Sequence, residues 1–172
     1  LYLFLLGRFQ ALFTAYLGWL SFLPRMIGRM LARRKQAGIA FERMRDGLAR
    51  SEFTLLFQPQ VDLRTDRIFA VEALVRWRHP ALGLLSPLKF IPLAEETGLI
   101  VPLGDWILHE ACRRNKAWQD AGLPPLRISV NVSARQFKEK TLLDRVNNAL
   151  RESGMAANHL ELELIEGLSM QE

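Results

Sequence analysis

Carboxylate and amide side chains interrupt three β-prone segments at positions where an apolar residue would be expected. Glu72 lies in IFAVEALVRW, Asn131 in LRISVNVS and Glu163 in HLELELIE. Because side chains alternate across a strand, each of these residues shares a face with the residues two positions away. Burying the Glu72 carboxylate without a partner would cost several kcal/mol, so Arg76, a metal ion or both must meet it. Corresponding faces of successive strands would bring the three residues to one side of a sheet.

Oxygen ligands without histidine or cysteine suit hard cations such as Mg²⁺, Mn²⁺ or Ca²⁺. An inward polar layer on parallel strands is also how barrel enzymes build their sites. The residues leave a second interpretation open, in which Glu72 forms a simple ion pair with Arg76 on its own strand. The single cysteine excludes a disulfide framework and a CxxC zinc site, and the three scattered histidines exclude an HExxH pair.

The segments that must position these residues alternate between strand and helix patterns. Strands are predicted at 53–61, 68–77, 126–133 and 159–166, and helices at 87–97, 102–121 and 141–153. Ser86 is the expected N-cap of the first of these helices, and a glycine follows each of the three. Strands that alternate with helices predict an α/β fold with parallel pairing. The first two strands are joined only by DLRTDR, so this pair is expected to be antiparallel.

The N-terminal part of the chain has a different character. Residues 1–23 are dominated by apolar side chains and are followed by a basic cluster, which predicts a transmembrane helix with its C-terminal flank in the cytoplasm. Arg8 and Gln10 interrupt the run, and the alternative is an amphipathic helix at the interface or against a neighbour. Residues 24–52 are predicted to be a basic helical linker, which leaves residues 53–172 as the folded domain.

The net charge of +5 is unevenly distributed along the chain. Residues 1–50 hold nine basic and two acidic side chains, whereas residues 51–172 hold fourteen and sixteen. The folded part therefore has no electrostatic footprint for a polyanion, and neither DNA nor RNA is expected as a partner.

Residues 53–172 resemble the first half of an EAL domain, the bacterial cyclic di-GMP phosphodiesterase module. The signature triplet is Glu72-Ala73-Leu74, within VEALVRWRHP. Four more blocks are similar to the family in order: FQPQVDL at 57–63, SPLKFIPLAEETGLI at 86–100, ISVNVSARQF at 128–137 and LELELIE at 160–166. The resemblance implies a truncated TIM-like (β/α)₈ barrel with an irregular first strand, here preceded by the hydrophobic, transmembrane-type helix.

The resemblance also implies a function, namely hydrolysis of cyclic di-GMP to linear pGpG with Mg²⁺ or Mn²⁺ as cofactor. Carried over by motif, Glu72, Asn131 and Glu163 are expected to bind the metal. Arg76 resembles the arginine that contacts the phosphate of the substrate, and Gln58 resembles a ligand-contacting glutamine of the opening strand. A homodimer formed through the EAL domain is one arrangement that the resemblance allows.

Two departures from the family pattern bear on activity. Ile165 replaces the usual threonine beside Glu163, and the family's remaining catalytic residues are expected beyond residue 172. The chain is therefore expected to be a fragment of a phosphodiesterase, and the alternative is an inactive cyclic di-GMP-binding module or a truncated remnant. The expected location is the bacterial inner membrane with the EAL domain in the cytoplasm, or the cytoplasm if residues 1–23 do not insert.

Overall fold

The structure, a computed structural model, describes Met26 and residues 38–165. Internal contacts divide the chain into two compact units, residues 1–40 and 41–172. The predicted membrane segment, residues 1–23, lies outside the described residues, as does much of the predicted linker. Among the residues that are described, no helix is both long and apolar enough to cross a bilayer.

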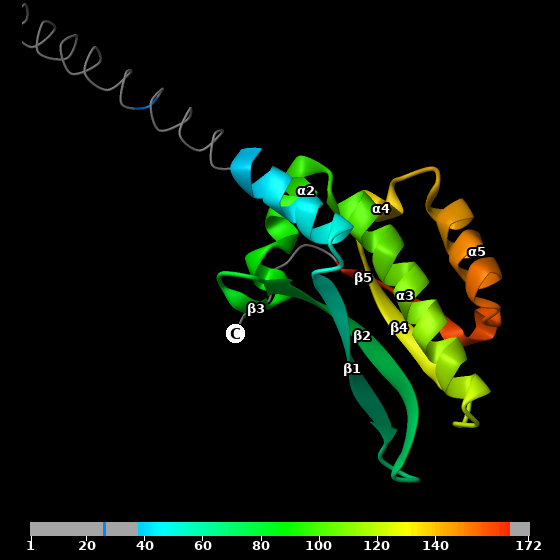
Figure 1. The fold of residues 1–172 in the computed structure, drawn as a ribbon. Helices are drawn as coiled ribbons and strands as arrows, with labels where there is room; N and C mark the ends of the chain where they lie inside the picture. The colour runs from blue at the N-terminus through cyan, green and yellow to red at the C-terminus, as the bar shows by residue number, and fades with distance from the viewer. Residues whose placement is uncertain (1–25, 27–37, 166–172) are drawn as a thin grey trace, which may run out of the picture. The chain divides into compact units, whose positions relative to one another are not determined.

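The second unit is built on a five-stranded mixed sheet (Figure 1). Residues 38–49 are helical. The elements that follow are β1 (Phe53–Asp62), β2 (Arg67–His79), β3 (Gly83–Leu85), the 3₁₀ helix η1 (Pro87–Lys89), α2 (Ile91–Thr97), α3 (Ile100–Asp120), β4 (Arg127–Ser133), α4 (Ala134–Phe137), α5 (Leu142–Ser153), η2 (Ala157–His159) and β5 (Leu160–Ile165). The order in the sheet is β1-β2-β4-β5, with β3 paired to β2.

The β1–β2 hairpin confirms the antiparallel pair predicted from the short connection. Asp62 begins its turn by accepting a hydrogen bond from the Arg64 backbone N–H at 2.8 Å, and Asp66 adopts a positive φ of 53°. Asp and Asn tolerate this left-handed conformation better than most residues. The pairs β2–β4 and β4–β5 are parallel, as predicted for strands separated by helices.

One face of this sheet carries the hydrophobic core. Alternation along β2 predicts that Phe69, Val71, Ala73, Val75 and Trp77 share this face, and the last four of them are buried. Phe69 is instead 41% exposed, and its ring faces the Arg127 guanidinium. The register shifts between Gln60 and Val61, and this irregularity interrupts the alternation next to Phe69.

Helix α3 covers this apolar face through a stripe expected from its apolar spacing: Leu103, Ile107 and Ala111 are buried, and Trp118 at its far end is partly buried with its ring edge-on to Phe57. Cys112 is completely buried on the same helix, and burial raises the pKa of its thiol to about 11. A protonated, inaccessible thiol is chemically inert, so Cys112 serves to pack the core.

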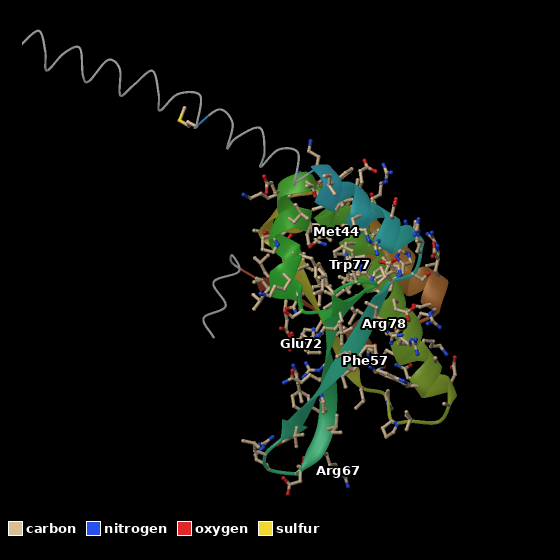
Figure 2. The ribbon with its side chains drawn as sticks, turned by 60° about the vertical axis from the view of Figure 1, so that its left-hand side comes forward. Met44, Phe57, Arg67, Glu72, Trp77 and Arg78 are labelled. Carbon is tan, nitrogen blue, oxygen red and sulfur yellow. The ribbon has the colours of Figure 1, made fainter. Side chains whose placement is uncertain are left out.

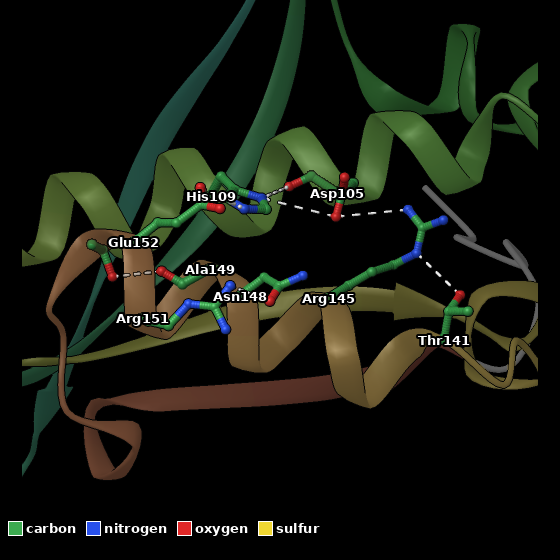
Figure 3. A network of polar contacts seen from close by, with 9 residues as sticks. Asp105, His109, Thr141, Arg145, Asn148, Ala149, Arg151 and Glu152 are labelled. Carbon is green, nitrogen blue, oxygen red and sulfur yellow. Dashed lines mark hydrogen bonds and ion pairs between the residues drawn. The ribbon is translucent and has the colours of Figure 1, made fainter.

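Helix α5 is joined to α3 by polar contacts on the outer side of the sheet (Figure 3). His109 Nε2 lies 3.3 Å from a carboxylate oxygen of Glu152, and Arg145 Nη1 lies 3.6 Å from Asp105 Oδ1. These contacts orient α5 along α3, so the two helices form one layer on the helix-covered face.

Residues 86–97 differ from the single helix predicted for this segment. The chain forms η1 and then α2, with a break at Phe90, and Ser86 makes no capping hydrogen bond through its side chain. Pro92 has no N–H to donate to the Leu88 carbonyl, so a continuous helix would lose a bond there. The break turns Phe90 into the core, where it is 1% exposed and packs edge-on against Phe53.

Candidate functional site

The strand register places the predicted site residues on the face of the sheet that lies opposite the helices. Gln58 on β1 pairs with Glu72 on β2, and Asn131 on β4 pairs with Glu163 on β5. Glu72 also pairs with Ser129, which lies two residues before Asn131 and therefore on the same side. Figure 2 shows Glu72 in the middle of the hairpin, with the core residue Phe57 on its other side. Four strands thus contribute to one polar face.

A direct hydrogen bond joins the first two candidate metal ligands. Asn131 Nδ2 donates to Glu72 Oε1 at 2.7 Å, in partly buried surroundings. A hydrogen bond to an ionised carboxylate is about twice as strong as one between neutral groups. The bond occupies one carboxylate oxygen and the amide nitrogen, whereas Glu72 Oε2 and Asn131 Oδ1 have no hydrogen-bond partner among residues 38–165. These two oxygens remain for another ligand.

Glu163 is the third candidate, and it stands beside Asn131 in the parallel ladder. It is partly buried, and no basic side chain of the described residues pairs with it. Its neighbour Glu161, two positions earlier on β5, is exposed and pairs with Arg127 at 3.6 Å. The two glutamates of β5 therefore differ: the charge of Glu161 is compensated by a basic residue, and that of Glu163 is not.

Arg76 does not form the ion pair with Glu72 that was the alternative interpretation of this strand. Its Nη1 donates to the Val75 carbonyl at 2.9 Å, and no ion pair involves Arg76 in the described part of the chain. The reason is geometric, because four residues of an extended strand span about 13 Å. Asn131 lies on the neighbouring parallel strand, about 5 Å away, and is the closer partner for Glu72.

The remaining predicted substrate residue, Gln58, is exposed and lies directly across the hairpin from Glu72. Arg76 is partly buried on the same face, four residues beyond Glu72. The structure therefore brings Gln58 and Arg76 to the same face as the candidate metal ligands, Gln58 across the hairpin from Glu72 and Arg76 further along β2.

Sequence reasoning assigned no role to Ser129, although it placed this residue on the polar face. Its side chain is completely buried, and its hydroxyl has no hydrogen-bond partner within residues 38–165. One feature of the sequence could have identified it. Ser129 lies between Ile128 and Val130 in an apolar strand, where a buried position is usually apolar and a hydroxyl needs a hydrogen-bond partner.

A second residue that sequence reasoning missed fixes the far end of β2. Glu52 Oε2 accepts hydrogen bonds from Trp77 Nε1 at 3.0 Å and from Arg43 Nη2 at 2.7 Å. The Trp77 N–H, with the neighbouring Arg43 charge, holds the pKa of the Glu52 carboxyl below its usual range. Trp77 directly follows Arg76, so this contact secures the strand end from which Arg76 projects.

The donor set fits a hard divalent cation, since it consists of two carboxylates and one amide oxygen. It is not a complete site, because Mg²⁺ takes about six oxygen ligands in octahedral geometry. Within residues 38–165 there is no cluster of three or more His, Cys, Asp or Glu side chains that could hold a metal ion. Glu72, Asn131 and Glu163 would therefore supply one side of a metal site.

Known proteins are similar to this chain over most of its length. The family model described as EAL domain matches residues 42–172. The bifunctional diguanylate cyclase/cyclic di-GMP phosphodiesterase MucR of Pseudomonas aeruginosa is 44% identical over 129 residues, which is 75% of this chain and 19% of MucR. The cyclic di-GMP phosphodiesterase NbdA of the same organism is 41% identical over 142 residues, 83% of this chain and 18% of NbdA. The chain thus spans about a fifth of the length of these relatives.

A solved structure, the PaMucR phosphodiesterase in its c-di-GMP complex, has the same arrangement of strands and helices. It aligns with a TM-score of 0.71 and 43% sequence identity, covering 77% of this chain and 54% of the solved one. The predicted α/β fold is therefore confirmed, with a mixed sheet of the kind that this relative contains.

Proposed function

This chain belongs to the EAL domain family, and we propose on that basis that it supplies one side of a divalent-metal site for hydrolysis of cyclic di-GMP to pGpG. The observation that carries the proposal is the 2.7 Å contact between Glu72 and Asn131, with Glu163 next to Asn131 in the ladder. The names of two relatives, MucR and NbdA, describe cyclic di-GMP phosphodiesterases. The oxygen-only donor set agrees with the Mg²⁺ or Mn²⁺ expected from the sequence.

In this proposal Glu72, Asn131 and Glu163 hold the cation, which when bound polarises a phosphoryl oxygen and lowers the pKa of a bound water. The planar guanidinium of Arg76 matches a pair of phosphodiester oxygens, and its partly buried position on the same face suits it to orient the substrate. Gln58, exposed opposite Glu72, offers an amide to the rest of the nucleotide.

We also propose a barrel architecture for this domain. Residues 53–172 form the N-terminal half of a (β/α)₈ barrel, and further metal ligands come from its other strands. Two observations support it. The described strands carry helices on one face and polar side chains on the other, as barrel strands do. The chain covers 54% of the solved relative.

One observation favours a second candidate function, binding of cyclic di-GMP without turnover. Ile165 occupies the position where the family pattern has threonine, and it lies two residues from Glu163 on the same face. The sec-butyl side chain of isoleucine has no hydroxyl, so a polar group that threonine would supply is missing beside the candidate ligands. Ile165→Thr would separate the two functions, since only a catalytic site gains turnover from the restored hydroxyl.

The expectations that residues 1–23 anchor the chain in the bacterial inner membrane and that the domain forms a homodimer stay predictions. Both concern the intact protein in its cell, where fractionation and cross-linking would test them.

The proposed site is tested by replacing its carboxylates with amides of the same shape. We expect Glu72→Gln and Glu163→Gln each to weaken Mn²⁺ binding at least about tenfold, because each removes a charged ligand. Titration followed by electron paramagnetic resonance measures the affinity for the 172-residue chain. In a complete EAL domain that carries these residues, the same two variants should lose pGpG production in a chromatographic assay.

Glu161→Gln is the matched control, since it changes the same residue type on the same face of β5 but removes a carboxylate already paired with Arg127. Its Mn²⁺ affinity should equal that of the wild type. If all three variants bound Mn²⁺ as tightly as the wild type, Glu72 and Glu163 would not be metal ligands, and the proposal would be wrong.

A further inference from the structure

Ser129 carries a hydroxyl group with no partner in a completely buried place. Its exposed fraction is 0%, and its Oγ makes no hydrogen bond to any residue that the structure describes. The other buried or partly buried serines of the neighbouring elements differ: Ser133 Oγ accepts from the Gln136 N–H at 3.3 Å, and Ser153 Oγ donates to the Ala149 carbonyl at 2.7 Å. A buried unpaired hydroxyl destabilises a fold, so alanine at position 129 would give a more stable folded chain.

The register puts this hydroxyl beside the candidate metal ligands. Ser129 pairs with Glu72 on one side and with Glu161 on the other, and it precedes Asn131 by two residues on the same face. Glu161 is exposed and engaged by Arg127. Of the two residues that pair with Ser129, Glu72 is therefore the one whose carboxylate remains as an acceptor, across one strand spacing of about 5 Å.

Asn131 cannot bind a cation through its oxygen and keep its present hydrogen bond to Glu72. In the structure its nitrogen donates to Glu72 Oε1, which directs its carbonyl oxygen away from that carboxylate. An amide binds a hard cation through its oxygen, since the nitrogen carries two hydrogens and no free lone pair. An amide that turns its oxygen to a cation held by Glu72 gives up the hydrogen bond to Glu72, and the carboxylate then needs another donor.

We propose that Ser129 is that donor: a positioning residue whose hydroxyl hydrogen-bonds the Glu72 carboxylate when a divalent cation occupies the site. The inference rests on the proposed metal-dependent function and deepens it. A hydroxyl rotates freely about its C–O bond, so it can remain unpaired in one state and donate in the other without moving the strand. Ser129 itself does not touch the cation, but it fixes the carboxylate that does.

The proposal predicts opposite changes in thermal stability and in Mn²⁺ affinity when Ser129 is replaced. Ser129→Ala removes an unpaired hydroxyl, so the melting temperature of the metal-free chain should rise. The same change removes the donor to Glu72, so Mn²⁺ affinity should fall about tenfold, as is usual when a residue that orients a metal ligand is lost. A serine with a merely structural role would lower the melting temperature on replacement and leave Mn²⁺ affinity unchanged.

The experiment uses the full 172-residue chain with Mn²⁺ alone as the probe, and follows binding by electron paramagnetic resonance and unfolding by circular dichroism. Ser129→Thr keeps the hydroxyl and should retain wild-type Mn²⁺ affinity. Ser153→Ala is the matched control, because it removes a hydroxyl from α5, outside the candidate site. It should lower the melting temperature and leave Mn²⁺ affinity unchanged.

Equal Mn²⁺ affinity for wild type and Ser129→Ala overturns the inference and leaves the proposed function intact. A wild-type chain that binds no Mn²⁺ overturns the proposed metal site and this inference together, so the wild-type titration distinguishes the two failures. If Ser129→Thr is too large to fold, Ser129→Ala still decides the question, since it only removes an atom.

Discussion

Glu52 shows how one carboxylate oxygen can fix several elements at once. Its Oε2 receives the Trp77 indole N–H and the Arg43 guanidinium, and the same guanidinium lies 5.6 Å from the centre of the Trp77 ring. These contacts connect the helix of residues 38–49 to the end of β2. Because the donors favour the ionised form, the pKa of Glu52 is lower in the folded chain than in the unfolded one.

A depressed folded pKa gives stability a definite pH dependence. The contribution of Glu52 is fully present above the unfolded pKa, about 4.3 for glutamate, and is lost as the pH falls through the lower folded pKa. We therefore expect Glu52→Gln to melt below the wild type at pH 7 and the difference to shrink below about pH 4.

Thermal unfolding monitored by circular dichroism at pH 7 and at acid pH measures this difference. Glu42→Gln is the control, because its carboxylate is exposed and, among the described residues, pairs with Arg45 on the same helix. Its melting temperature should match that of the wild type at both pH values. A gap between wild type and Glu52→Gln that is the same at both pH values would contradict the assigned role of the charge.

At the scale of elements, the helix of residues 38–49 reaches the sheet because one position has no side chain. A Cβ on Gly47 would lie 2.9 Å from Trp77 Nε1 and 3.0 Å from Glu52 Oε2, closer than real Cβ atoms come to such neighbours. The approach lets Met44 enter the core, where it is 2% exposed. Here close packing outweighs the low helix propensity of glycine, which costs about 1 kcal/mol relative to alanine.

We expect Gly47→Ala to destabilise the chain by about 1–3 kcal/mol, since overpacking against Trp77 exceeds the gain in helix propensity. Gly38→Ala is the matched control: residue 38 is also helical, but no atom of the described part of the chain lies within 4 Å of its added Cβ. It should leave stability unchanged or raise it by up to about 1 kcal/mol. Urea unfolding curves of both variants measure the difference, and a stabilised Gly47→Ala would show that the helix is not held in this position.

At the scale of the whole molecule, the order of strands and helices could be predicted from the sequence because local signals agree with tertiary structure. Apolar periodicity marks the strands, and the glycines expected to follow the three helices, Gly98, Gly122 and Gly154, all have positive φ. The strand β3 was missed, since three residues carry no periodicity and the strand exists through its pairing with β2. The four-residue helix α4 was missed although Ser133 and Gln136 have the spacing of a capping box.

The candidate site, like the fold, could be predicted from the sequence only in part. A period of two was enough to align Glu72, Asn131 and Glu163 on one face, because alternation is a property of each strand alone. The choice between Arg76 and Asn131 as the partner of Glu72 was not open to sequence reasoning. That choice depends on the register of β2 against β4, which brings Glu72 beside Ser129 and within reach of Asn131. The unpaired hydroxyl of Ser129 depends on the same register.

The last strand of the sheet leaves apolar surface open. Leu162 and Leu164 lie on the helix-covered side of β5, yet they are 41% and 48% exposed. Among the described residues, β5 pairs with β4 and with no other strand, so one row of its backbone donors and acceptors is free. Exposed, apolar strand edges template pairing with other chains.

We therefore expect a protein that comprises residues 41–172 to self-associate at micromolar concentration, and the double variant Leu162→Lys/Leu164→Lys to be mainly monomeric, since charged side chains on an edge strand oppose edge-to-edge pairing. Sedimentation velocity measures the change. Leu143→Lys is the control, because Leu143 is 69% exposed but lies on α5, away from the strand edge. It should associate like the wild type. A monomeric wild type with one cooperative thermal transition would show that the edge of β5 is already protected.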